Sequence, residues 1–194
     1  MGRRLLATVA VTAGLIGAVA LVVTSTASAE GDKGNGGKHD PPYETIQNED
    51  LPPQIQVDEN AFVENARFIG KGKQVYDCTN GAYVGREPNA VLQKIRGDRV
   101  GIHFVGPQWA HHDGSRVKAP PLANVPSPDG PGNVAWLLLG ATENAGAPGL
   151  AFSETQRIQR ALTRGGVPPS SCSASSPQTV SIDYSTLYIF YNAK

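Results

Sequence analysis

The sequence predicts a mainly β fold, an antiparallel β-sandwich or barrel with one short α-helix near residues 154–164. Stretches rich in β-branched and aromatic residues recur along the chain, and strands favour these residue types. Glycine and proline separate the stretches; the 194 residues include 22 glycines and 15 prolines, which supply turns. A single segment, FSETQRIQRALTRGG, has apolar residues at helical spacing.

The first strands are predicted as two hairpins. Residues 61–69 and 73–78 flank the sequence GKGK, which we interpret as a glycine-bearing turn. The stretches AVLQKI and RVGIHFVG flank RGDR in the same way, with Gly97 and Asp98 at the turn. Residues 110–133 then form a long connection rich in proline and glycine. Connections of this length in compact domains are functional or mobile.

A central strand is predicted over residues 134–140. The sequence VAWLLLG is an uninterrupted apolar run bounded by glycine and proline clusters, which indicates a strand buried on both faces. Leu137 and Leu139 should face one side of the sheet, and Trp136 and Leu138 the other, because side chains alternate along a strand.

The predicted helix follows this strand. Ser153 and Gln156 have the spacing of a capping box, and Gly165 suits the position after a helix C-terminus. TVSIDY and TLYIFY are then interpreted as closing strands.

The N-terminal residues are predicted to be a signal peptide, residues 1–29. Arg3 and Arg4 precede an uncharged apolar run, and Ala27-Ser28-Ala29 matches a cleavage site that leaves Glu30 first. Residues 30–45 are rich in glycine and charge, so we interpret them as a disordered linker. Residues 46–194 form the single β-rich domain. The chain is therefore expected to be secreted, extracellular and soluble, with no membrane anchor after cleavage.

Charge and cysteine content narrow the function classes. Loss of Arg3 and Arg4 from 17 basic residues, against 17 acidic ones, gives the mature chain a net charge of about −2. Nucleic-acid binding needs clustered basic residues, which are not found here, so no nucleic-acid partner is predicted. Cys78 and Cys172 are the two cysteines, and an even count in an exported chain predicts one disulfide.

A set of short motifs appears in order along the chain: GKGKQVYDC, VGIHFVGPQW, DGS, VAWLLL, IQRALTRGG and YIFY. In this set the chain resembles a family of secreted bacterial and fungal proteins catalogued as a domain of unknown function. The resemblance covers residues 55–191 and implies no particular activity. In the family's pattern the residues before DGS are not a fixed histidine pair, so it implies no family-wide role for His111 and His112.

The stretch GPQWAHHDGS, residues 106–115, holds the main candidate site. Trp109, His111, Asp113 and Ser115 are the candidate ligand-binding residues, because an aromatic ring beside polar groups offers apolar contact and hydrogen bonds together. In an extended segment, His111 and the adjacent histidine would point to opposite sides. We therefore predict no metal, no cofactor and no covalent chemistry in what we interpret as a solvated turn.

Competing interpretations remain open beside this one. A metal-dependent enzyme would use His103, His111 and Asp113, and a hydrolase would add Ser115 as the nucleophile. His103 is more simply interpreted as a half-buried, hydrogen-bonded histidine.

Two patterns of basic residues add weaker hypotheses. Residues 96–98 spell an RGD adhesion tripeptide, which a hairpin turn also explains. Arg157, Arg160 and Arg164 would line one face of the predicted helix, either as an anion site or as a solvated face. The sequence as a whole favours a non-catalytic extracellular module, binding or structural, with an unknown extracellular ligand.

Overall fold

The computed structural model describes residues 42–194. The predicted signal peptide, its cleavage site between Ala29 and Glu30, and linker residues 30–41 lie outside the described residues. The last four residues assigned to the linker, 42–45, belong instead to the packed domain. Tyr43 is buried in an apolar cluster, since an aromatic side chain gains free energy by leaving water.

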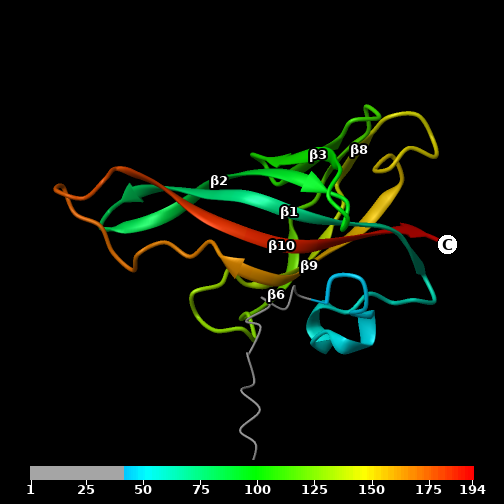
Figure 1. The fold of residues 1–194 in the computed structure, drawn as a ribbon, viewed down its shortest axis with the longest axis horizontal. Helices are drawn as coiled ribbons and strands as arrows, with labels where there is room; N and C mark the ends of the chain where they lie inside the picture. The colour runs from blue at the N-terminus through cyan, green and yellow to red at the C-terminus, as the bar shows by residue number, and fades with distance from the viewer. Residues whose placement is uncertain (1–41) are drawn as a thin grey trace, which may run out of the picture. The chain divides into compact units, whose positions relative to one another are not determined.

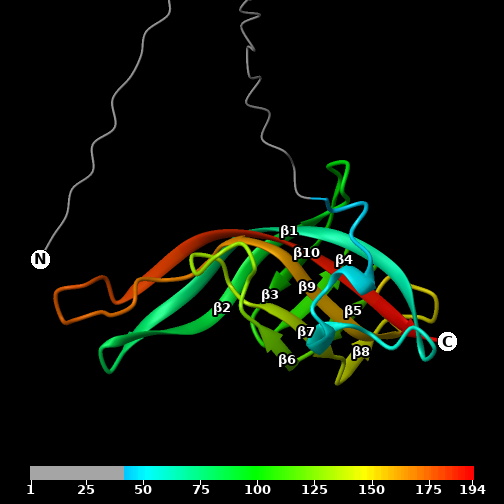
Figure 2. The same ribbon diagram turned by 90° about the horizontal axis from the view of Figure 1, so that it is seen from below.

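The domain is a ten-stranded antiparallel sheet that curls on itself (Figures 1 and 2). The mainly β, antiparallel class predicted from the sequence is confirmed. The strands are β1 Phe62–Thr79, β2 Ala82–Gln93, β3 Arg99–Phe104, β4 Gln108–His111, β5 Arg116–Lys118, β6 Pro121–Val125, β7 Trp136–Gly140, β8 Glu143–Ala145, β9 Thr155–Gly165 and β10 Thr179–Ala193. Two short 3-10 helices, η1 Asn48–Asp50 and η2 Pro53–Ile55, precede them. Within residues 42–194, no helix has the length and hydropathy of a membrane span.

The order of strands across the sheet is β6-β7-β9-β10-β1-β2-β3-β4-β5-β8. The long strands β9, β10, β1 and β2 form its middle, and Figure 2 shows them arching over the shorter strands of both flanks. The curl gives the sheet a concave inner face and a convex outer face. The predicted loop 110–133 contains β5 and β6, so much of it is paired in the sheet.

Side chains alternate between two apolar layers, as the period of a strand requires. Along β10, Leu187 and Ile189 enter the outer layer, whereas Tyr188 and Phe190 enter the inner one. The inner layer fills the curl with aliphatic side chains and with the aromatic rings of Phe68, Trp109, Phe152, Tyr188 and Phe190.

The N-terminal segment covers the outer face of the sheet. Its residues Leu51 and Ile55 are buried in the outer layer. The buried amide of Gln159 on β9 donates 2.8 Å hydrogen bonds to the Asn48 side chain and the Ile55 carbonyl, and it accepts one of 2.7 Å from the Tyr191 hydroxyl. The hydrogen bonds of this buried amide offset the cost of removing it from water, and they fix the N-terminal segment in place.

The first predicted hairpin is wrong, because β1 runs without a break through GKGK. The two glycines allow close packing instead of a turn. A side chain at Gly70 would meet the ring of Tyr188, and one at Gly72 would meet the backbone of Asn89 and Ala90 on β2. The second hairpin is confirmed: β2 and β3 pair around a turn in which Gly97 has a φ of 112°.

The predicted helix at residues 154–164 is also wrong, since residues 155–165 form strand β9. It lies between β7 and β10, and an apolar layer covers each of its faces, with Ile158 in the inner layer and Ala161 in the outer one. The alternation expected of a half-exposed strand is therefore hidden. A bulge adds to the effect. Leu162 and Thr163 lie opposite the single residue Thr186, and Leu162 has a φ of 52°.

The last five residues of VAWLLLG form β7, which begins at Trp136 rather than at the predicted residue 134, and its two faces are as predicted. Leu137 and Leu139 contact the inner layer, and Trp136 and Leu138 the outer one. The strand is not central, because only β6 lies between it and the edge of the sheet.

The predicted disulfide between Cys78 and Cys172 is confirmed, with a Cα–Cα distance of 6.0 Å. It lies near the far end of β1, where β1, β2 and β10 extend together beyond the rest of the sheet (Figure 1). Both cysteines also form backbone hydrogen bonds: Cys78 N–H donates to the Gln178 carbonyl, and Cys172 N–H donates to the Gly81 carbonyl.

Candidate functional site

The stretch GPQWAHHDGS forms the β4–β5 hairpin. Trp109 on β4 is fully buried in the inner layer. Its ring stacks on His103 of β3, with centroids 4.2 Å apart and planes 9° apart, and meets Tyr188 edge-on at 5.4 Å. Trp109 therefore forms part of the core rather than of the surface of the turn.

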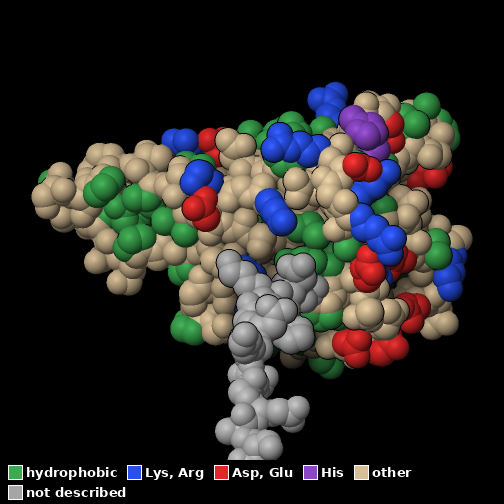
Figure 3. All heavy atoms as spheres, in the orientation of Figure 1, with side chains coloured by type: hydrophobic (Ala, Val, Ile, Leu, Met, Phe, Trp, Pro, Cys, Tyr) green, Lys and Arg blue, Asp and Glu red, His purple; other side chains and the backbone are tan. Residues whose placement is uncertain are grey.

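The two adjacent histidines do not diverge, contrary to the prediction. The ring centroids of His111 and His112 are 4.4 Å apart, because β4 ends at His111 and His112 already belongs to the turn. His112 is exposed, and Figure 3 shows histidine side-chain atoms at the surface beside acidic groups. His111 is mostly covered by Phe68 and Phe152, with ring centroids 5.8 and 5.6 Å away.

Asp113 and Ser115 join the hairpin to the segment before β9. The Asp113 carboxylate accepts hydrogen bonds from the Ser115 hydroxyl at 2.6 Å, the Ser115 N–H at 2.8 Å and the Ala151 N–H at 2.8 Å. The Ser115 oxygen in turn accepts a 3.0 Å bond from the N–H of Phe152. We call this set, Asp113 and Ser115 with the N–H groups of Ala151 and Phe152, the clasp.

The clasp controls the charge of Asp113. Burial alone would raise the pKa of this carboxyl, but the hydrogen bonds from Ser115 and Ala151 favour the ionised form, as does His111. The net effect holds the pKa of Asp113 well below its usual range. His111 Nδ1 lies 3.1 Å from the same carboxylate.

The geometry of the clasp opposes the hydrolase interpretation. Ser115 is fully buried, its hydroxyl proton points to Asp113, and its oxygen accepts from a backbone N–H. A serine nucleophile instead needs an exposed oxygen hydrogen-bonded to a base. The prediction that this turn is solvated is therefore correct for the exposed His112 and wrong for the buried Ser115.

His103 is separate from the clasp. It is fully buried rather than half-buried, and its Nδ1 lies 2.8 Å from the Gln108 carbonyl oxygen. Since a carbonyl only accepts, Nδ1 carries the proton. Burial lowers the pKa of His103 to about 3, partly opposed by the bond to Gln108, so the ring is neutral. Among residues 42–194, no three His, Cys, Asp or Glu side chains are placed to hold a metal ion.

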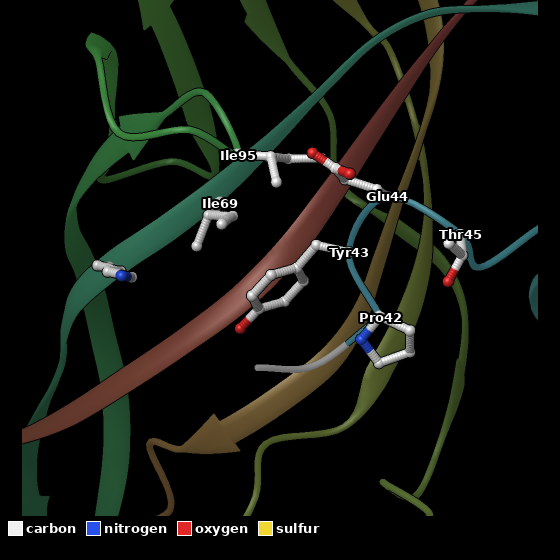
Figure 4. Close-up of a pocket in the computed structure, with 7 residues that line it drawn as sticks. Pro42, Tyr43, Glu44, Thr45, Ile69 and Ile95 are labelled. Atoms are coloured by element: carbon white, nitrogen blue, oxygen red, sulfur yellow. The ribbon is translucent and has the colours of Figure 1, made fainter. Parts of the chain in front are cut away.

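Two of the cavities lie on opposite faces of the sheet. The outer pocket, about 390 Å³, lies beneath the N-terminal segment, where Tyr43, Ile69 and Ile95 border one space (Figure 4). The inner pocket, about 160 Å³, lies in the curl of the sheet and is lined by side chains from eight of the ten strands. Its functional groups come from Gln74, His103, Trp109, Arg160 and Tyr188.

The predicted arginine stripe is divided by the strand geometry of β9. Arg160 lines the inner pocket, whereas Arg157 lies over the ring of Phe62, 4.6 Å from its centroid, and Arg164 lies 3.9 Å from Asp129. Gln74 and Tyr188 were missed in the sequence, because nothing local marks residues brought together from β1 and β10. Arg96 of the RGD tripeptide is exposed on the β2–β3 turn and contacts Glu44.

Comparison with known proteins gives one match. A family model described as "Protein of unknown function (DUF3455)" matches residues 84–192, which run from β2 to β10. No curated protein and no solved structure matches the chain.

Proposed function

Since the chain belongs to DUF3455, a family of proteins of unknown function, its role has to be argued from its own residues, and we propose an extracellular module that binds a ligand without catalysis. The observation that carries the proposal is the clasp. The two groups best suited to covalent or acid–base chemistry, Ser115 and Asp113, are bonded to each other and to the backbone of residues 151 and 152.

The compartment is part of the same proposal. The Cys78–Cys172 disulfide supports an oxidising environment, where such bonds persist. The sequence of residues 1–29 supports export, with a mature chain that begins at Glu30.

Binding is supported by the inner pocket. Pockets in the mouths of curled or closed sheets commonly bind small molecules, with apolar walls and a few polar groups that fix the orientation of the ligand. Leu137, Leu139 and Tyr188 supply apolar surface here, and Arg160 supplies a charge.

The experiment is to express the full chain in a secreting host and to recover the protein from the medium. We expect the intact mass to be that of a chain beginning at Glu30. Before reduction, neither cysteine should react with an alkylating reagent. The mature protein is then screened against small molecules by thermal shift, because a ligand that binds the folded state raises the midpoint temperature of unfolding by mass action. Compounds that stabilise the protein should be recovered unchanged after prolonged incubation. Conversion of such a compound, abolished by Ser115→Ala or His111→Asn, would contradict the proposal.

A further inference from the structure

The inner pocket contains a positive charge without a counter-charge. Arg160 is half-buried, and its guanidinium Nε and Nη2 both donate to the Ala135 carbonyl, at 3.1 and 2.8 Å. Within residues 42–194, no carboxylate oxygen lies within 4.0 Å of the guanidinium of Arg160. A charge withdrawn from water is stabilised by an opposite charge, so this position favours an anion.

One further donor in the wall of the same pocket is without a partner. The indole Nε1 of Trp109 is buried and has no hydrogen-bond partner among residues 42–194. Buried donors are nearly always paired, so a ligand oxygen that reaches this one gains a hydrogen bond. His103, neutral and stacked on Trp109, supports the indole without adding charge.

The rest of the wall limits the size and character of the ligand. Leu137, Leu139 and the ring of Tyr188 are apolar, and three prolines also line the cavity. A cavity of about 160 Å³ accommodates roughly one six-membered ring. The occupant therefore combines a small hydrocarbon body with an acceptor-rich anionic group.

We propose that the inner pocket binds a small organic carboxylate, with its oxygens against Arg160 and Trp109 Nε1 and a body of about one ring against Leu137 and Tyr188. A carboxylate suits the site because it is planar and matches the fork of a guanidinium. The proposal rests on the binding role proposed above and names the class of ligand.

The test is an NMR titration of the ¹⁵N-labelled mature protein with benzoate. The chain has two tryptophans, and they lie on opposite faces of the sheet: Trp109 in the inner layer and Trp136 in the outer one. Their indole N–H signals are assigned with Trp109→Phe and Trp136→Phe. We expect benzoate to shift the Trp109 signal saturably at concentrations of about 1 mM or less, and to leave the Trp136 signal in place.

Controls separate charge from shape. Benzamide has the same ring without the charge and should bind roughly tenfold or more weakly, and inorganic phosphate should leave the Trp109 signal unmoved. Arg160→Gln should weaken benzoate binding by a similar factor, whereas Arg157→Gln, on the opposite face of β9, should change it by less than about twofold. Backbone spectra confirm that each variant is folded, and the benzamide comparison needs no variant.

Three outcomes overturn the proposal: no saturable shift of Trp109, equal shifts of both indoles, or equal affinity for benzamide. If benzoate fails while other compounds in the thermal-shift screen stabilise the protein, the ligand class is wrong and the binding role stands. Chemical conversion of benzoate or of another ligand would instead contradict the binding role itself.

Discussion

The unfolding free energy should fall by roughly 4–5 kcal/mol between about pH 7 and pH 3 on account of one residue, His103. Burial lowers its pKa in the folded chain to about 3, whereas the unfolded chain has the ordinary value of 6.5. Between these values the unfolded state binds a proton that the folded state does not. The stabilisation is therefore complete above pH 6.5 and is lost as the pH falls toward 3.

His103→Asn isolates this contribution. Asparagine retains a donor near the position of Nδ1, which bonds the Gln108 carbonyl at 2.8 Å, and it does not titrate. The unfolding free energy of both proteins is measured with urea from pH 7 to pH 4.5. It should fall more steeply with decreasing pH in the wild type, by up to about 1.4 kcal/mol per pH unit. The exposed His112→Asn should follow the wild type. Parallel profiles for wild type and His103→Asn would show that folding does not lower the pKa of His103, and would contradict this prediction.

Loss of the disulfide should lower the unfolding free energy by about 4 kcal/mol. Cys78 and Cys172 are 94 residues apart, so the bond restricts a long loop in the unfolded chain, and the entropy it removes grows with loop length. The change is large beside the roughly 5–15 kcal/mol that stabilises a typical domain.

The measurement is urea unfolding of the oxidised wild type against Cys78→Ser/Cys172→Ser. We expect the variant to unfold at a lower urea concentration than the wild type. Its unfolding free energy should also depend more steeply on urea, because the uncrosslinked chain exposes more surface when unfolded. A difference under about 1 kcal/mol would mean that the pairing of β1 and β10, with the backbone bonds at Cys78 and Cys172, restrains this end of the sheet without the bond.

The sequence was most informative where the cause of structure is local. The turn at Gly97 needs a residue that tolerates positive φ, and the faces of β7 follow from the alternation of its side chains. The disulfide followed from there being two cysteines in a chain whose sequence predicts export. Each of these inferences used only neighbouring residues or a simple count.

The sequence was misleading where contacts between distant segments determine the local structure. The segment 155–165 has a helical spacing of apolar residues, yet it pairs on both sides and contains a bulge, so neither alternation nor propensity reveals a strand. The glycines at 70 and 72 indicate a turn locally, but their function is close packing against Tyr188 and Ala90. Local sequence gives no sign of such contacts.

The same limit applied to the candidate site. The proximity of Asp113 and Ser115 is local and visible in the sequence, but their partners are backbone groups of residues 151 and 152, more than thirty positions away. The inner pocket draws Gln74, Trp109 and Arg160 from three strands distant in the chain. Sequence patterns identified the residue types there but not their convergence.

The clasp is the centre of the functional account, and its effect on stability tests that account without knowledge of a ligand. Catalytic residues are often held at a cost to stability, so their replacement leaves the fold unchanged or more stable. Residues of a structural clasp behave in the opposite way, because removing one leaves a buried partner unsatisfied.

The decisive measurement is therefore the unfolding free energy, by urea at pH 7, of Asp113→Asn, Ser115→Ala and the double variant. We predict a loss of about 1–3 kcal/mol for each single change, and a double loss smaller than their sum, because the two groups share the bond at 2.6 Å. His112→Asn, in the same turn and exposed, should change the value by less than about 0.5 kcal/mol. Unchanged or increased stability in the Asp113 and Ser115 variants would contradict the structural role and favour a catalytic one.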